Sequence, residues 1–199
     1  DARRSLGAPR RQGHSHGPAA SRRVSARLAL TVGDPAGIGP EIVLRALSSA
    51  ERPPGSWVVY GPLASLEERA ARFALKPIAE MGSPVVDVGG GPFPLGQVSA
   101  EGGRAAAAAV LGAARDALAG RVDAVVTAPL HKESLRAAGH PWPGHTEMLA
   151  EAASVSDVAM MFVGGGLRVA LLTIHRSLRS VPDAITGPDV VPCASNSGG

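Results

Sequence analysis

The 199-residue sequence has a single cysteine, Cys193, and few aromatic residues, which make up 3% of the chain. One cysteine cannot form a disulfide framework or a cysteine-based zinc site within the chain, which favours a reducing, cytoplasmic location. The core must therefore be built from Ala, Val, Leu and Ile, and a hydrophobic content of 45% is enough for one domain. No apolar run reaches the length of a membrane span, and we expect no membrane partner.

Positive charge is concentrated at one end of the chain. Residues 1–27 hold seven arginines and one acid, so this segment has a formal charge of +6. Since the whole chain has a formal net charge of +3, the remainder has a charge of −3. The basic pI is therefore no signature of a nucleic-acid-binding protein, and we do not expect a nucleic-acid partner. We predict that residues 1–26 are a disordered basic extension. A transit peptide, a nucleic-acid-binding arm, a solvated tail and a misassigned start codon all stay open for this segment.

Strands alternate with helices along most of the sequence. Buried strands are expected at 27–32, 56–60, 84–88 and 122–126, and helices at 40–48, 63–73, 101–119, 132–138 and 146–153. Strands at 158–162 and 167–173 are expected to form a hairpin around residues 164–166. This order predicts an α/β protein, a three-layer α/β/α unit whose sheet is covered on both faces.

The stretch TVGDPAGIGPEI, residues 31–42, places glycines 33, 37 and 39 between a strand and a helix. Exposed N–H groups and the positive end of a helix dipole favour a phosphate or carboxylate at such a turn. Pro40 suits the first helical turn, where no N–H is needed. The stretch matches neither the dinucleotide-binding nor the Walker fingerprint, so a ligand loop and a purely structural turn both stay open.

Polar residues gather after the later strands. The segment VTAPLHK brings Thr127 and Lys132 to the carboxyl end of a strand, where α/β sheets bind ligands. His145 and Thr146 stand at the start of a helix, and His175 directly follows a buried strand. Each histidine could also have a purely structural role, as a helix cap, a surface residue or a hydrogen-bonded side chain at the end of a strand. A lone histidine cannot hold a metal, because a site needs three or more ligands.

Four motifs in this order, TVGDPAGIGPEI, VTAPLHK, PGHTE and VALLTIH, resemble the 4-hydroxythreonine-4-phosphate dehydrogenase (PdxA) family over residues 27–186. The chain is also distantly similar to isocitrate and isopropylmalate dehydrogenases, whose fold the resemblance implies. It further implies NAD-dependent oxidation and decarboxylation of 4-phosphohydroxy-L-threonine to 3-amino-2-oxopropyl phosphate, a step in pyridoxal phosphate biosynthesis. The implied cofactors are NAD and a divalent metal (Zn, Mg or Co), and the implied assembly is a homodimer acting on a small phosphorylated hydroxy acid.

The resemblance also implies roles for particular residues. His145 and Thr146 match the substrate-contacting pair of the family, and His175 matches the first of three metal-binding histidines. The glycine loop lies beside the nucleotide, which points to Gly33, Asp34, Gly37 and Gly39 as cofactor contacts. The resemblance assigns no catalytic residue, and Lys132 is the candidate.

The sequence departs from the family pattern near its end. The remaining metal histidines of the family, and a Lys, an Asn and an Arg that contact substrate, lie further toward the C-terminus than this chain extends. We therefore expect a truncated, incomplete fold with an irregular tail at 187–199, uncovered apolar surface, and no measurable NAD reduction by this chain alone. Two other interpretations stay open: a dehydrogenase for erythronate or threonate 4-phosphate, and a non-catalytic binding protein that uses the basic tail.

Overall fold

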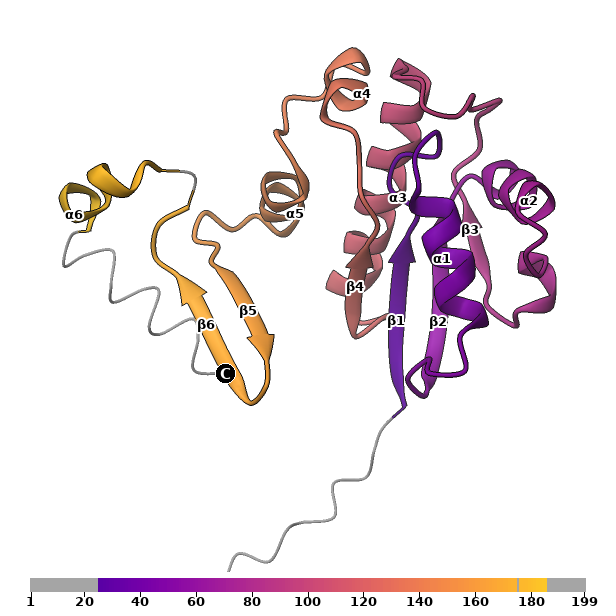
Figure 1. Cartoon of the computed structure of the whole chain (residues 1–199), viewed down its shortest axis with the longest axis horizontal. Helices are drawn as coiled ribbons and strands as arrows, with labels where there is room; N and C mark the ends of the chain where they lie inside the picture. The colour runs from indigo at the N-terminus through magenta and orange to yellow at the C-terminus, as the bar shows by residue number, and fades with distance from the viewer. Residues whose placement is uncertain (1–24, 175, 186–199) are drawn as a thin grey trace, which may run out of the picture.

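A computed structural model describes residues 25–174 and 176–185, and the predictions for the N-terminal extension, the C-terminal tail and His175 lie essentially outside this part. Its centre is a four-stranded parallel sheet in the order β3-β2-β1-β4 (Figure 1). The strands are β1 (Ala26–Thr31), β2 (Gly55–Gly61), β3 (Val85–Asp87) and β4 (Ala124–Thr127). All eleven predicted elements are present, with ends within two residues of those expected.

Helices cover both faces of this sheet, as the sequence predicts. Side chains alternate along a strand, so Leu30, Val32 and Val59 pack with α1 (Gly39–Ser48) and α2 (Leu63–Arg72). Ala29 and Tyr60 face the opposite way, onto α3 (Ala100–Leu118). The three-layer α/β/α arrangement is therefore confirmed, with Ala, Val and Leu supplying most of the core.

The alanine-rich helix α3 is the centre of a second packing layer. Ser99 caps it, because its hydroxyl accepts the N–H of Gly102 at 3.0 Å. Two shorter helices, α4 (Lys132–Ala137) and α5 (His145–Ala153), pack on α3 through Leu135 and Met148, which are fully buried. Both helices follow β4 in the sequence, and their packing on α3 places their starts near the carboxyl edge of the sheet (Figure 1).

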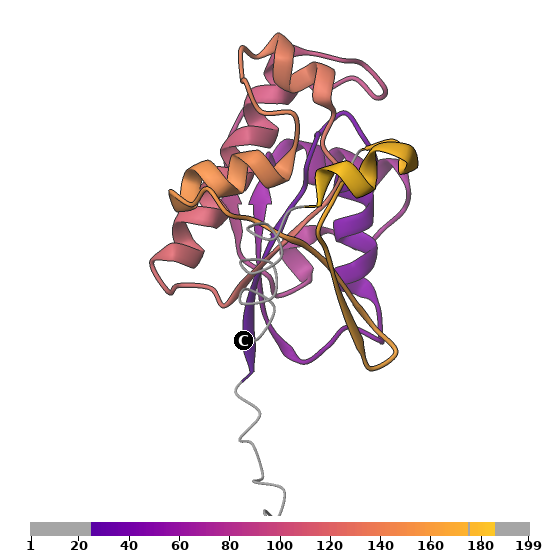
Figure 2. The same cartoon turned by 90° about the vertical axis from the view of Figure 1, so that its left-hand side faces the viewer.

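The last strands do not join the main sheet. β5 (Met160–Gly164) and β6 (Leu167–Leu171) pair only with each other as an antiparallel hairpin, which extends away from the four-stranded sheet (Figures 1 and 2). Two short 3-10 turns, η1 (Ile78–Glu80) and η2 (Leu178–Ser180), and the one-turn helix α6 (Val181–Ala184) complete the described elements. No helix in residues 25–174 or 176–185 is long and apolar enough to cross a bilayer.

Candidate functional site

The loop between β1 and α1 is packed against the end of β4. The N–H of Asp34 donates to the carbonyl oxygen of Pro129 at 3.0 Å. Gly33 has a φ of +64°, and a Cβ atom there would overlap the Pro129 oxygen and lie 2.6 Å from that of Ala128. Gly33 therefore permits both a left-handed backbone and a close backbone approach. Two motifs almost a hundred residues apart meet at this point.

Asp34 holds this loop together from within. Its side chain is buried, Oδ1 accepts the N–H of Ala36 at 2.9 Å, and Oδ2 accepts the hydroxyl of Ser134 at 2.8 Å. Both carboxylate oxygens are thus used inside the protein, as a buried carboxylate requires. The structure places Asp34 in the internal framework of the loop, and a direct cofactor contact by this residue stays a prediction.

The start of α1 has no side-chain cap, its residues Gly39 and Pro40 are buried, and Glu41 lies in its first turn. Gly39 lies so close to the carbonyl of Val32 that a Cβ would overlap it, and Pro40 occupies the first turn. The first turn of a helix has N–H groups without intrahelical partners and the positive end of the dipole, so it can bind a phosphate or carboxylate.

A pocket of about 230 Å³ lies beside the same loop. It is bounded by three segments, the glycine loop, a stretch before α3 and the residues after β4. Of the four residues predicted to contact a cofactor, Asp34 and Gly37 line it, whereas Gly33 and Gly39 are occupied by backbone packing. The full lining is Asp34, Ala36, Gly37, Ile38, Gly96, Gln97, Val98, Pro129, Leu130 and His131.

His145 begins α5 next to the same strand end. Its Nε2 atom is buried without a hydrogen-bond partner in the described part of the chain. Burial lowers the pKa of His145, and the backbone of Ala128 opposes this shift. The His145 ring therefore has one nitrogen, Nε2, without a partner within the described residues, and the backbone of Ala128 as a neighbour. His145 and Gly33 therefore share Ala128 as a neighbour.

The sequence predicts four further site residues, Thr127, Lys132, Thr146 and His175. Thr127 pairs in register with Thr31 at the ends of β4 and β1. Thr146 and Lys132 are exposed in the first turns of their helices, and neither side chain makes a hydrogen bond or ion pair within the described residues. His175 lies outside the described residues, so the structure does not place it.

The described residues do not make up a metal site. Within 25–174 and 176–185 there is no group of three or more His, Cys, Asp or Glu side chains that could hold an ion. The metal prediction therefore depends on His175 and on ligands that these residues do not provide.

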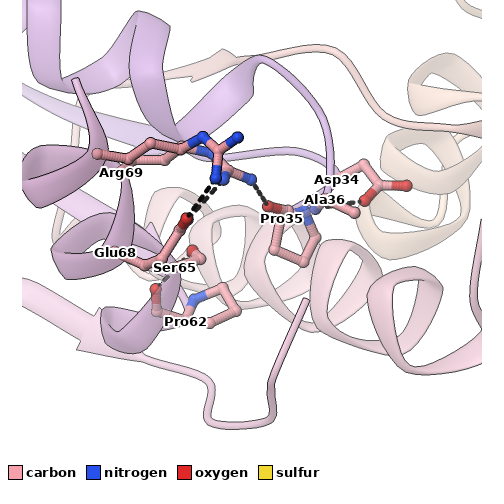
Figure 3. A network of polar contacts seen from close by, with 8 residues as sticks. Asp34, Pro35, Ala36, Pro62, Ser65, Glu68 and Arg69 are labelled. Carbon is pink, nitrogen blue, oxygen red and sulfur yellow. Dashed lines mark hydrogen bonds and ion pairs between the residues drawn. The ribbon is translucent and has the colours of Figure 1, made fainter. Parts of the chain in front are cut away.

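Two residues of the site escaped the sequence analysis. Ser134 binds Asp34, and Arg69 of α2 donates from Nη2 to the carbonyl oxygen of Pro35 at 2.9 Å (Figure 3). The signal for Arg69 is its position, three residues after the buried Leu66, on the apolar face of the helix. Ser134 carries no comparable signal, because its partner lies 100 residues away.

Comparison with known proteins identifies the family of this chain. The sequence model of the family described as "Pyridoxal phosphate biosynthetic protein PdxA" matches residues 54–196. The chain belongs to the PdxA family. A 4-hydroxythreonine-4-phosphate dehydrogenase of Burkholderia vietnamiensis is 42% identical over 168 residues, which are 80% of this chain and 51% of the relative.

Other PdxA relatives extend the comparison. A Bradyrhizobium diazoefficiens protein with the provisional name D-threonate 4-phosphate dehydrogenase is 37% identical over 181 residues, 81% of this chain and 51% of the relative. A crystal structure of a 4-hydroxythreonine-4-phosphate dehydrogenase from Burkholderia phymatum superimposes with a TM-score of 0.77 at 33% identity, covering 86% of this chain and 56% of that one. The chain thus spans about half the length of the relatives it matches.

Proposed function

We propose that this chain serves the NAD-dependent oxidation and decarboxylation of 4-phosphohydroxy-L-threonine to 3-amino-2-oxopropyl phosphate in pyridoxal phosphate biosynthesis. The observation that carries the proposal is the meeting of the glycine loop, the end of β4 and His145 around Ala128 and Pro129. These three segments contain three of the four motifs that resemble the family. A cytoplasmic homodimer is part of the same proposal.

Some groups of the chain could bind the phosphate of a ligand, and others could form hydrogen bonds with a substrate hydroxyl. The uncapped start of α1 and the adjoining pocket suit the phosphate of a substrate or of a dinucleotide. His145 suits a hydrogen bond with the substrate, because its Nε2 atom has no partner within the described residues. Thr146, in the next position, adds a hydroxyl, and Lys132 stays the candidate for a catalytic group.

The two implied cofactors fit to different degrees. NAD, when bound, accepts the hydride from the carbinol carbon, and Gly37, Ile38 and Val98 of the pocket offer it a smooth, largely apolar wall. For the divalent metal, His175 is the proposed ligand, and we derive no chemical step through the metal because the described residues provide no ligand set.

Calorimetric titration of 4-phosphohydroxy-L-threonine into the purified chain tests the proposal. We expect saturable binding that His145→Ala weakens by about tenfold, the effect of losing one hydrogen bond in a buried site. His14→Ala, outside the predicted site, is the matched control and should bind as the unaltered chain does. No binding of any phosphorylated hydroxy acid, with or without NAD, would show that the proposal is wrong.

A second candidate substrate is D-threonate 4-phosphate, because one relative at 37% identity carries a name for that activity. Parallel titrations compare the affinities of the chain for the two compounds. Tighter binding of D-threonate 4-phosphate would make it the preferred candidate substrate. Absorbance of NADH with added zinc, magnesium or cobalt measures turnover beside a full-length PdxA relative. We expect none for this chain alone, and metal-dependent turnover abolished by His175→Ala would contradict that prediction.

A further inference from the structure

Arg69 is a buried cation directly behind the glycine loop. Its side chain is 1% exposed, although it belongs to a helix whose other charged residues are exposed. Nη2 donates to the carbonyl oxygen of Pro35 at 2.9 Å, Nη1 pairs with the carboxylate of Glu68, and Nε is buried with no partner among the described residues. Figure 3 shows the guanidinium between these two acceptors.

Packing alone does not account for this arrangement. A buried ion pair is weak evidence for stability, because desolvation of the charges offsets their attraction and an apolar side chain of similar volume often does as well. The partner here is also half exposed, since the side chain of Glu68 has 50% of its surface in solvent. The bond to Pro35 is the contact that the charged group makes with another segment of the chain.

The contact controls one of three consecutive carbonyl groups in the loop. The Asp34 oxygen accepts the N–H of Gly37 at 3.0 Å, and the Ala36 oxygen accepts the N–H of Gly96 at 2.9 Å. Arg69 binds the carbonyl between them. With all three oxygens bound inside the protein, none is left to repel an anion at the start of α1.

Arg69 contacts the loop at a residue that does not line the pocket. Asp34, Ala36, Gly37 and Ile38 line the pocket, whereas Pro35 does not and is fully buried. The guanidinium therefore does not reach the pocket through Pro35. Its effect on a ligand would be transmitted through the backbone of the loop.

We infer that Arg69 is a positioning residue, which holds the Pro35 carbonyl away from the pocket and so keeps the 33–39 loop in the shape that binds an anionic ligand. The inference rests on the proposed function only in its statement about the ligand. Its statement about the loop is independent, because it concerns hydrogen bonds between protein atoms alone.

Backbone amide exchange tests the statement about the loop. In Arg69→Met, which keeps an apolar stem of similar length, we expect the amides of Ala36, Gly37 and Gly96 to exchange at least about tenfold faster, because the loop opens more often. The matched control is Arg72→Met on the same helix, since Arg72 is exposed and also lies near Glu68, at 3.9 Å. It should leave these amides unchanged.

Titration with NAD and with inorganic pyrophosphate tests the statement about the ligand. We expect Arg69→Met to weaken binding by about tenfold, as for the loss of a charged hydrogen bond, and Arg69→Lys to restore part of both binding and amide protection. If the unaltered chain binds neither probe, the proposed function fails while the exchange measurement still decides the role in the loop.

Wild-type exchange rates and wild-type binding in a folded Arg69→Met protein would overturn the inference. Weaker binding without faster exchange would also overturn it, because Arg69 would then act on the ligand directly. If Arg69→Met does not fold, as judged by circular dichroism, the same criteria apply to Arg69→Gln, which retains a polar side chain.

Discussion

The hydroxyl of Ser134 donates a 2.8 Å hydrogen bond to Oδ2 of Asp34, although the two residues are 100 positions apart. Both side chains are buried, so the bond ties the glycine loop to α4 in a place that water does not reach. A second hydrogen bond, from the N–H of Asp34 to the carbonyl oxygen of Pro129, joins the loop to the residues after β4. Together they fix the relative position of the two motifs that form the candidate site.

Ser134→Ala should destabilise the protein by about 1–3 kcal/mol, because it leaves a buried carboxylate oxygen without its donor. Urea unfolding should show a lower midpoint at an unchanged m-value. Ser156→Ala, at an exposed serine, is the control and should stay within about 0.5 kcal/mol of the unaltered chain. An equal stability of the two variants would mean that the Asp34–Ser134 bond contributes nothing measurable.

Gly33→Ala should cost far more than Gly82→Ala. The two glycines have nearly the same φ, +64° and +65°, but a Cβ at Gly33 meets the carbonyls of Pro129 and Ala128, whereas a Cβ at Gly82 has no atom within 4 Å. The left-handed backbone alone costs about 1–2 kcal/mol, and overpacking adds about 1–3 kcal/mol. The difference between the two unfolding free energies isolates the steric part, and similar values would show that the loop shifts to accept a methyl group.

The stability of the fold should depend on pH through His145. Burial lowers the pKa of His145 below its ordinary value of 6.5, so between the two values the unfolded chain binds more protons than the folded one. The free energy of unfolding should fall as pH drops below 6.5, until the pH passes the lowered pKa of the folded state. His145→Gln should reduce the stability difference between about pH 7.5 and about pH 5, measured by chemical denaturation. An unchanged difference would mean that other groups cause the dependence.

The hairpin β5–β6 should make the chain self-associate. Phe162 and Leu167 are 60% and 69% exposed, and Val169, the cross-strand partner of Phe162, is 49% exposed. Contiguous apolar patches of this kind are unusual on soluble monomers. Light scattering should show association that grows with concentration, and Phe162→Lys should reduce it.

Leu118→Lys is the control for the hairpin, because Leu118 is 63% exposed but lies at the end of α3, away from the patch. It should leave association unchanged. A monodisperse monomer with a sharp two-state melt would contradict the prediction.

Local pattern in the sequence was enough to predict the elements and the layers. The continuous apolar run around Ala29 and Leu30 marks β1 as buried on both faces, and the spacing of Leu66 and Ala70 marks one face of α2. These signals are local, because a strand or a helix repeats within a few residues. The glycine loop was also visible, since a strand, a Gly/Pro turn and a helix follow one another directly in the sequence.

Only the tertiary structure decided how the parts of the site meet. The sequence shows that residue 33 is glycine, but the reason, the carbonyls of Ala128 and Pro129, comes from a strand almost a hundred residues later. In the same way, the charges of Asp34 and Arg69 suggest solvent or ligand contacts, whereas the fold buries both and gives them Ser134 and Pro35 as partners. The sequence by itself determined which residue types were available at the carboxyl edge of the sheet. Which of them face a pocket and which support the backbone depended on long-range packing, because burial and hydrogen-bond partners are set by segments that no local pattern connects.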